Sequence, residues 1–288
     1  MNKKCLKLLS PAKLNLFLHI TGRRNDGYHQ IQTFFQLLDL GDHMTFTENH
    51  TGLITLNSLN LDIPIKDNLI YRAALSLKAH CHSKNGADIT INKQLPHGGG
   101  LGGGSSNAAT TLLALNQLWN CNLSLTELAG LGLQIGADVP LFVYGSTAWA
   151  EGIGEKLQVI EYPEKSLPNY YVVIKPNCSV STEQIFSHQQ LTRNTSPITI
   201  AAFFNEGGHN DCEAVVKQLY PEVEFSLNWL NAFASAQLTG TGACIYAAFL
   251  HEEDARNTLE QLPNDLIGYL ARGIPTSPVH EVLGLAPG

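Results

Sequence analysis

The chain has 288 residues, about twice the ~150 that a single domain typically takes, and 44% of them are hydrophobic, which predicts two compact lobes. The formal net charge of −7 repels nucleic acid, so no DNA or RNA partner is expected and any anion-binding site must be built locally. No apolar run reaches the ~20 residues of a membrane span and the start has no signal-peptide pattern, which predicts a cytoplasmic protein without a membrane partner.

The first elements predict a β-rich N-terminal sheet. From Lys13 the chain alternates between an apolar face and a face that carries Lys13 and Asn15, as a half-buried strand does. The Asn-Asp-Gly turn at 25–27 leads into a second strand, and residues 43–48 and 53–57 predict further short strands.

A glycine-rich loop lies between a predicted strand and a predicted helix. Helical spacing begins near residue 66 and Gly86 is placed to end it, and residues 87–96 return to strand alternation. Six of the seven residues from 98 to 104 are glycine, and residues 105–119 then predict a helix free of Gly and Pro.

The remaining elements mix strands and helices. A capping box at Ser124 and Glu127 predicts a helix that ends at Gly136, and residues 139–160 predict two strands joined by a Gly-Ile-Gly-Glu turn. The polar stretch at 161–169 predicts a boundary between domains 1–162 and 163–288. Beyond it come a strand at 170–175, helical segments, a strand at 243–250, another helix and a last strand near 268–271, an α+β pattern.

The six cysteines are far apart in the sequence and contain no C-x-x-C pair, so we expect them to be reduced and mostly buried. The His-Cys-His cluster at 80–82 resembles a metal site, but its histidines point to different sides of a helix end. A solvated helix end is therefore favoured there.

The glycine loop has the composition of a phosphate cradle. Glycines allow backbone N–H groups to point inward, and the helix that follows adds unpaired N–H groups and a positive dipole end. A flexible linker is the alternative, but linkers rarely join a strand and a helix within one lobe. The loop has neither the Gly-Lys-Ser/Thr of a P-loop nor the spacing of a Rossmann unit, which favours a kinase of another lineage.

Three segments in this order resemble the signature regions of the GHMP small-molecule kinases: PAKLNLFLHITGRRNDGYH at 11–29, PHGGGLGGGSSNAA at 96–109 with GADVPLF at 136–142, and LTGTGACIYA at 238–247. They are most similar to the branch that phosphorylates a cytidine diphosphate-linked methylerythritol in non-mevalonate isoprenoid (terpenoid) biosynthesis. The resemblance covers nearly the whole chain. It implies a two-lobe α+β fold, with a ribosomal-protein-S5-like nucleotide-binding lobe at 1–162 and a ferredoxin-like lobe at 163–288.

The resemblance implies that Lys13 and Asp138 are the catalytic pair of a direct, ATP-dependent phosphoryl transfer to an alcohol, supported by the loop at 240–242. Asp138 would take or orient the proton of the attacking hydroxyl, and Lys13 would lower the pKa of that hydroxyl and offset phosphoryl charge. On residue chemistry alone, a solvated lysine and a turn aspartate remain open alternatives. The implied contacts to ATP are Pro96, His97, Gly98, Gly99, Gly100, Leu101, Gly102, Gly103, Gly104, Ser105 and Ser106.

For the substrate, the resemblance implies that Tyr28 and Phe186 sandwich a cytosine ring and that His29 bonds its edge. Asn15 and Thr182 are expected as further substrate contacts. On residue chemistry alone, Tyr28 and Phe186 can equally be core aromatics.

Mg²⁺ is expected with ATP because it neutralises charge between the β- and γ-phosphates. Ser106 is the expected protein contact of this ion, and the other protein ligands of the ion are unknown. His97 stands where the family commonly has methionine, and its role is left open.

A monomer or weak homodimer is expected. The alternatives are a GHMP kinase for homoserine or a mevalonate-like acid, a non-catalytic nucleotide sensor, and a cytidine-nucleotide-binding scaffold. An acid substrate would favour an arginine clamp over the Tyr28–His29 pair.

Overall fold

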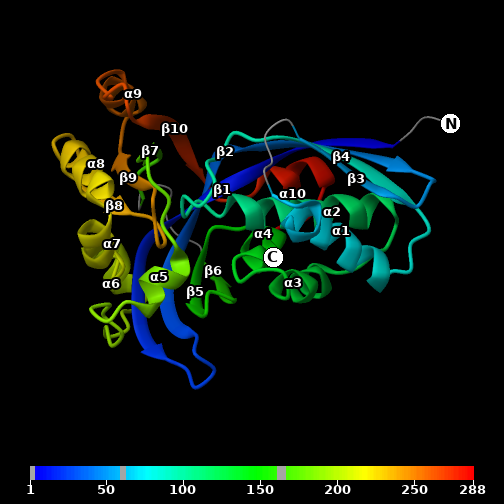
Figure 1. Ribbon diagram of the computed structural model, residues 1–288, viewed down its shortest axis with the longest axis horizontal. Helices are drawn as coiled ribbons and strands as arrows, with labels where there is room; N and C mark the ends of the chain where they lie inside the picture. The colour runs from blue at the N-terminus through cyan, green and yellow to red at the C-terminus, as the bar shows by residue number, and fades with distance from the viewer. Residues whose placement is uncertain (1–3, 59–62, 161–166) are drawn as a thin grey trace.

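The structure is a computed structural model that describes residues 4–58, 63–160 and 167–288 (Figure 1). Its strands are β1 Cys5–Arg23, β2 His29–Asn49, β3 Ile54–Ser58, β4 Gly86–Asn92, β5 Ala148–Gly152, β6 Lys156–Val159, β7 Tyr170–Lys175, β8 Ala236–Leu238, β9 Ile245–Phe249 and β10 Ile267–Ile274. Its helices are η1 Ile65–Asp67, α1 Leu69–His80, α2 Gly103–Leu118, α3 Leu125–Leu133, α4 Val139–Tyr144, α5 Thr182–Ser187, α6 Ile200–Glu206, α7 Glu213–Leu219, α8 Pro221–Asn231, α9 Glu252–Glu260 and α10 Pro278–Leu283. The predicted α+β class is confirmed.

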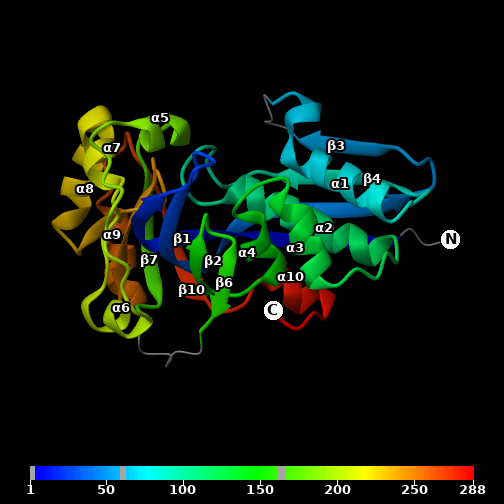
Figure 2. The same ribbon diagram turned by 90° about the horizontal axis from the view of Figure 1, so that it is seen from below.

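The described residues form one ten-stranded sheet in the order β3-β4-β2-β10-β7-β9-β8, with β1 and β5 also paired to β2 and β6 paired to β5. The long strands β1 and β2 form an antiparallel ribbon whose register runs from Cys5 opposite Thr47 to Arg23 opposite His29. Figures 1 and 2 show this ribbon extending from the first lobe, which holds β3 and β4, to the second lobe, which holds β7 to β9. Strand β10 joins the two parts by pairing with both β2 and β7.

Each lobe has its own apolar core. Helices α1 to α4 and α10 pack together with the first part of the sheet, where Phe46 of β2 and Ile89 of β4 are fully buried (Figure 1). In the second lobe, buried residues of β7, β8 and β9 pack with α7 and α8. Because Val279 and Leu283 belong to the first core, the end of the chain returns to the first lobe.

An aromatic cluster joins the lobes. Phe17 of β1 lies 5.2 Å from Trp149 of β5 and 5.0 Å from Phe203 of α6, measured between ring centroids. Since these rings come from both lobes and Phe17 is fully buried, they form a packed apolar core between the lobes.

The prediction of two strands over 139–160 is wrong in its first part, where the chain forms α4. Pro140 lies in the first turn of α4 and Gly145 ends it in the left-handed conformation, both common helix signals. Residues 139–143 are all buried, so their apolar run carries no helical periodicity and cannot be told from a buried strand. Strands β5 and β6 and the turn between them lie where predicted.

The expectation that the six cysteines are reduced and mostly buried is wrong, because Cys81 and Cys121 form a disulfide and only Cys212 and Cys244 are buried. They lie just beyond the C-terminal ends of α1 and α2, two helices that pack against each other. Among the described residues no group of three His, Cys, Asp or Glu side chains can hold a metal ion, and His80 and His82 flank the disulfide.

The predicted domain boundary at 162/163 lies outside the described residues.

Within the described ranges, no helix has the length and apolar character needed to cross a membrane.

Candidate active site

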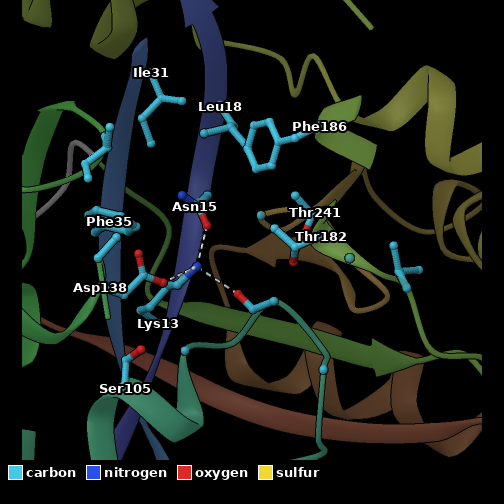
Figure 3. Close-up of a pocket in the computed structure, with 18 residues that line it drawn as sticks. Lys13, Asn15, Leu18, Ile31, Phe35, Ser105, Asp138, Thr182, Phe186 and Thr241 are labelled. Atoms are coloured by element: carbon cyan, nitrogen blue, oxygen red, sulfur yellow. Dashed lines mark hydrogen bonds and ion pairs between the residues drawn. The ribbon is translucent and has the colours of Figure 1, made fainter. Parts of the chain in front are cut away.

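A cavity of about 350 Å³ lies between the lobes and is lined by Lys13, Asn15 and Asp138, by three glycines of the glycine loop, and by the loop at 240–242 (Figure 3). Strand β1 supplies Lys13 and Asn15, and Asp138 immediately precedes α4. The structure therefore brings together the three signature segments, which are far apart in the sequence.

Lys13 lies at the base of this cavity with 3% of its surface exposed. Its Nζ donates hydrogen bonds to Oδ1 of Asn15 and, at 2.8 Å, to the carbonyl oxygen of Gly100, and it lies 3.7 Å from Oδ2 of Asp138. Burial lowers the pKa of the Lys13 ammonium below its ordinary value of 10.5, an effect that the neighbouring Asp138 carboxylate opposes. Lys13 is thus not the solvated strand-edge lysine that residue chemistry alone allowed.

Asp138 is positioned by the start of α4. It is the N-cap residue, but its side chain makes no capping hydrogen bond. Its carboxylate instead faces the Lys13 ammonium and stays partly accessible, with 33% of the side chain exposed (Figure 3). A partly accessible carboxylate in a cavity can reach the proton of a bound hydroxyl.

Loops from both lobes accept hydrogen bonds from backbone N–H groups of β1 at the cavity. The register between β1 and β2 shifts between Pro11 and Lys13, and the Lys13 N–H donates to the carbonyl of Leu101 at 3.0 Å. The Asn15 N–H donates to Oγ1 of Thr239 at 2.9 Å. The glycine loop and the segment before residue 240 are therefore bonded to the strand that carries the lysine.

The glycine loop needs its glycines at specific positions. Gly98, Gly100 and Gly102 have φ values of 61°, 77° and 71°, which disfavour other residues. A Cβ on Gly100 would lie 2.3 Å from the carbonyl oxygen of Thr239, so there is also no room for a side chain at this position. Gly102 is the N-cap of α2, whose first turn has no acidic residue to repel an anion.

The other residues predicted to contact ATP differ in position. Ser105 lines the cavity, whereas Ser106 is fully buried and its hydroxyl lies 2.8 Å from that of Ser10. His97 is exposed and Pro96 is partly buried at the start of the loop. The hydroxyl that faces the cavity is therefore that of Ser105.

Asp42 of β2 is a supporting residue that sequence reasoning missed. Its Oδ1 accepts the N–H groups of Gln94 and Leu95, both at 2.8 Å, and its Oδ2 accepts Nζ of Lys93 at 2.7 Å and Nδ2 of Asn107 at 2.9 Å. The carboxylate has no exposed surface. It thus fixes both the entry to the glycine loop and the first turns of α2.

Asp42→Asn is expected to lower the free energy of unfolding by about 3–5 kcal/mol, because an amide group would face two of these donors and leave the Lys93 ammonium without its partner. Urea denaturation measures this loss. The matched control is Asp39→Asn at an exposed position of the same strand. The Asp39 carboxylate accepts one backbone hydrogen bond, from the N–H of Arg272. Equal losses for both variants would contradict the assigned role of Asp42.

A second cavity, of about 410 Å³, is lined by Tyr28, His29 and Phe186 and shares Phe186 with the first. The rings of His29 and Phe186 are stacked, with centroids 5.0 Å apart and planes at 24°. Tyr28 is 60% exposed, so it is not the core aromatic that residue chemistry alone allowed. Thr182 lies at the junction of the two cavities, with its hydroxyl 2.8 Å from that of Thr241.

This fold and site define a small-molecule kinase of the GHMP type. Residues 68–146 match the family GHMP kinases N terminal domain, and residues 190–268 match GHMP kinases C terminal. The chain is 50% identical over 274 residues to a Vibrio cholerae 4-diphosphocytidyl-2-C-methyl-D-erythritol kinase, covering 95% of this chain and 93% of that protein.

Solved structures of GHMP kinases are also similar to this chain. A crystal structure of 4-(cytidine 5'-diphospho)-2C-methyl-D-erythritol kinase matches with a TM-score of 0.80 and 29% identity, covering 93% of this chain and all of that one. A homoserine kinase from Cytophaga hutchinsonii shares the fold, with a TM-score of 0.69, 16% identity and 97% of each chain covered. The chain belongs to the 4-diphosphocytidyl-2-C-methyl-D-erythritol kinase family of the GHMP kinases, and the predicted family is confirmed.

Proposed function

We propose that this protein transfers the γ-phosphoryl group of ATP to the 2-hydroxyl of 4-diphosphocytidyl-2-C-methyl-D-erythritol, a step of non-mevalonate isoprenoid biosynthesis. The observation that carries the proposal is the placement of Lys13 and Asp138, which meet in a cavity that has a glycine loop on one side and opens into an aromatic cavity on the other. Such a site can hold a phosphate donor and a nucleotide-bearing acceptor at once.

The catalytic steps follow from the positions of these two side chains. Asp138 accepts the proton of the attacking hydroxyl as its oxygen bonds to the γ-phosphorus and the bond to the β-phosphate oxygen breaks. Lys13 supplies positive charge beside the developing alkoxide and the transferred group, in a site with little water to weaken it. Transfer is direct, without a phosphorylated form of the protein.

The glycine loop is the proposed phosphate site. Gly98, Gly100 and Gly102 all line the cavity, and the N-terminus of the 16-residue helix α2 follows them. The buried Lys13 ammonium and this helix end therefore supply local positive charge in a chain whose net charge is −7.

The cavity also fits Mg²⁺ bound together with ATP. Hard oxygen ligands suit this ion, and the Ser105 hydroxyl lines the cavity beside the glycine loop. This hydroxyl would hold the ion together with phosphate oxygens. When bound, the ion would neutralise charge between the β- and γ-phosphates.

The lining of the inner cavity favours this acceptor over homoserine or a mevalonate-like acid. A small acid needs a cation near the reacting hydroxyl to hold its carboxylate, and an arginine is the usual choice. Among the described residues that line the cavity around Lys13, none is an arginine. Arg23 instead lines the outer cavity with Tyr28 and His29.

The test is ADP release by the purified protein with ATP, Mg²⁺ and one of three acceptors. We expect turnover with the cytidylated methylerythritol and at least a 100-fold lower kcat/KM with homoserine or mevalonate, since neither fills the aromatic cavity. Preferred turnover of one of the acids would overturn the substrate assignment. Nucleotide binding without turnover of any acceptor would instead favour a non-catalytic sensor or scaffold.

A further inference from the structure

Arg193 connects the two residues whose rings stack in the aromatic cavity, through the ring of His29 and the backbone of Phe186. Its Nε donates to Nε2 of His29 at 3.0 Å, and one terminal nitrogen donates to the carbonyl oxygens of Phe186 and His188 at 2.9 and 2.7 Å. The other terminal nitrogen donates to the carbonyl of Leu191 at 3.0 Å. The guanidinium thus holds the histidine ring and the segment that carries the phenylalanine in one arrangement.

This contact decides which nitrogen of His29 carries the proton. A guanidinium has only donors, so Nε2 must accept and the hydrogen of the neutral ring lies on Nδ1. Burial, and then the nearby Arg193 and Arg23, lower the pKa of His29, which favours the neutral ring. Within residues 4–58, 63–160 and 167–288, Nδ1 has no hydrogen-bond partner, so this donor is available to a ligand.

The plane of the donor is also fixed. The Nε2 atom of His29 accepts from Arg193, so the imidazole cannot turn without breaking that hydrogen bond, and the ring is also stacked on Phe186, whose backbone carbonyl Arg193 holds. A flat base that enters this cavity therefore meets an N–H group with a set direction and tautomer.

We propose that Arg193 is a specificity-determining positioning residue, which holds His29 as an Nδ1–H donor that selects cytosine over uracil. The inference rests on the proposed function, because it assigns the base of the acceptor to this cavity. N3 of cytosine is a hydrogen-bond acceptor, whereas N3 of uracil carries a hydrogen and would oppose the donor of His29. An imidazole with the opposite tautomer would present an acceptor and reverse this preference.

The test measures binding of CDP and UDP by isothermal titration calorimetry, which needs no turnover. Wild-type protein should bind CDP about 10–100-fold more tightly than UDP, the range for opposing a buried donor to a second donor. Arg193→Met should reduce this ratio to about threefold or less and weaken CDP binding about tenfold, while the Kd for ATP stays within twofold. In turnover, the variant should raise the KM for the cytidylated acceptor more than it lowers kcat. The control is Arg256→Met, an exposed residue on α9 whose hydrogen bond is to Glu252, and it should behave as wild type.

An unchanged CDP-to-UDP ratio in folded Arg193→Met would overturn the inference. Should that variant fail to fold, ¹⁵N NMR of the His29 ring in the wild-type protein decides, because a proton on Nδ1 supports the inference and a proton on Nε2 contradicts it. Preferential CDP binding without turnover of the cytidylated acceptor would refute the proposed function and leave the role of Arg193 standing.

Discussion

Asp138→Asn is expected to reduce kcat by about 10²–10⁴-fold, the usual contribution of a general base, with little change in the KM values for ATP and the acceptor. The amide keeps the shape of the side chain near Lys13 but cannot accept the hydroxyl proton. Steady-state ADP release measures the effect. The matched control is Asp265→Asn, an exposed residue between α9 and β10, which should keep wild-type kinetics.

Wild-type kcat in Asp138→Asn would remove this residue from the chemical step and leave the kinase assignment intact. A large rise in KM with unchanged kcat would instead make Asp138 a binding residue, because uniform binding affects KM alone.

Lys13→Met is expected to lower kcat by at least about 10²-fold, because it removes the buried positive charge beside the reacting groups. The thioether side chain has a similar length, so it fills the space of the lysine but loses the cation–π contact of Nζ with the Phe35 ring, whose centroid lies 5.4 Å away. Kinetics at saturating ATP and acceptor measure the loss. Retention of more than a tenth of the wild-type kcat would contradict the assigned role.

Lys13 also predicts the pH dependence of the wild-type protein. Burial holds the pKa of its ammonium below 10.5, so raising the pH removes its charge, and kcat/KM for ATP should fall in a limb centred below that value. The negative phosphates of bound ATP favour the charged form of Lys13 and so raise its pKa. The limb should therefore lie at higher pH in kcat, which reports the ATP complex, than in kcat/KM for ATP, which reports the protein without ATP. Lys13→Arg should lose the limb, because a guanidinium does not titrate in this range.

The sequence predicted the elements that depend on local patterns. The alternation from Lys13 and the strand–glycine–helix order at residues 86–118 are both found, since side-chain period and glycine placement are local properties. Helix α4 was missed because burial on all sides removed its period. Helix α2 begins at Gly103 rather than at residue 105, a small shift of a kind common at helix ends.

The detailed site could be predicted only in part. Neighbouring helical residues point about 100° apart, so which of Ser105 and Ser106 faces the cavity depends on how α2 is rotated. Asp42 and Asn107 are 65 positions apart and Arg193 and His29 are 164 apart, and no local pattern links either pair. The pairing of Lys13 with Asp138 came from family resemblance, because spacing alone did not select either residue.

The most direct test of the proposed reaction is a single-turnover rapid-quench experiment with γ-³²P-labelled ATP, Mg²⁺ and the cytidylated acceptor. The proposal predicts that wild-type protein passes the label straight to the acceptor with no labelled protein at any time, and that Asp138→Asn binds both substrates but transfers at least 100-fold more slowly. A labelled protein that forms and decays fast enough to account for turnover would contradict direct transfer, and transfer at the wild-type rate by Asp138→Asn would contradict the role of Asp138 as the base.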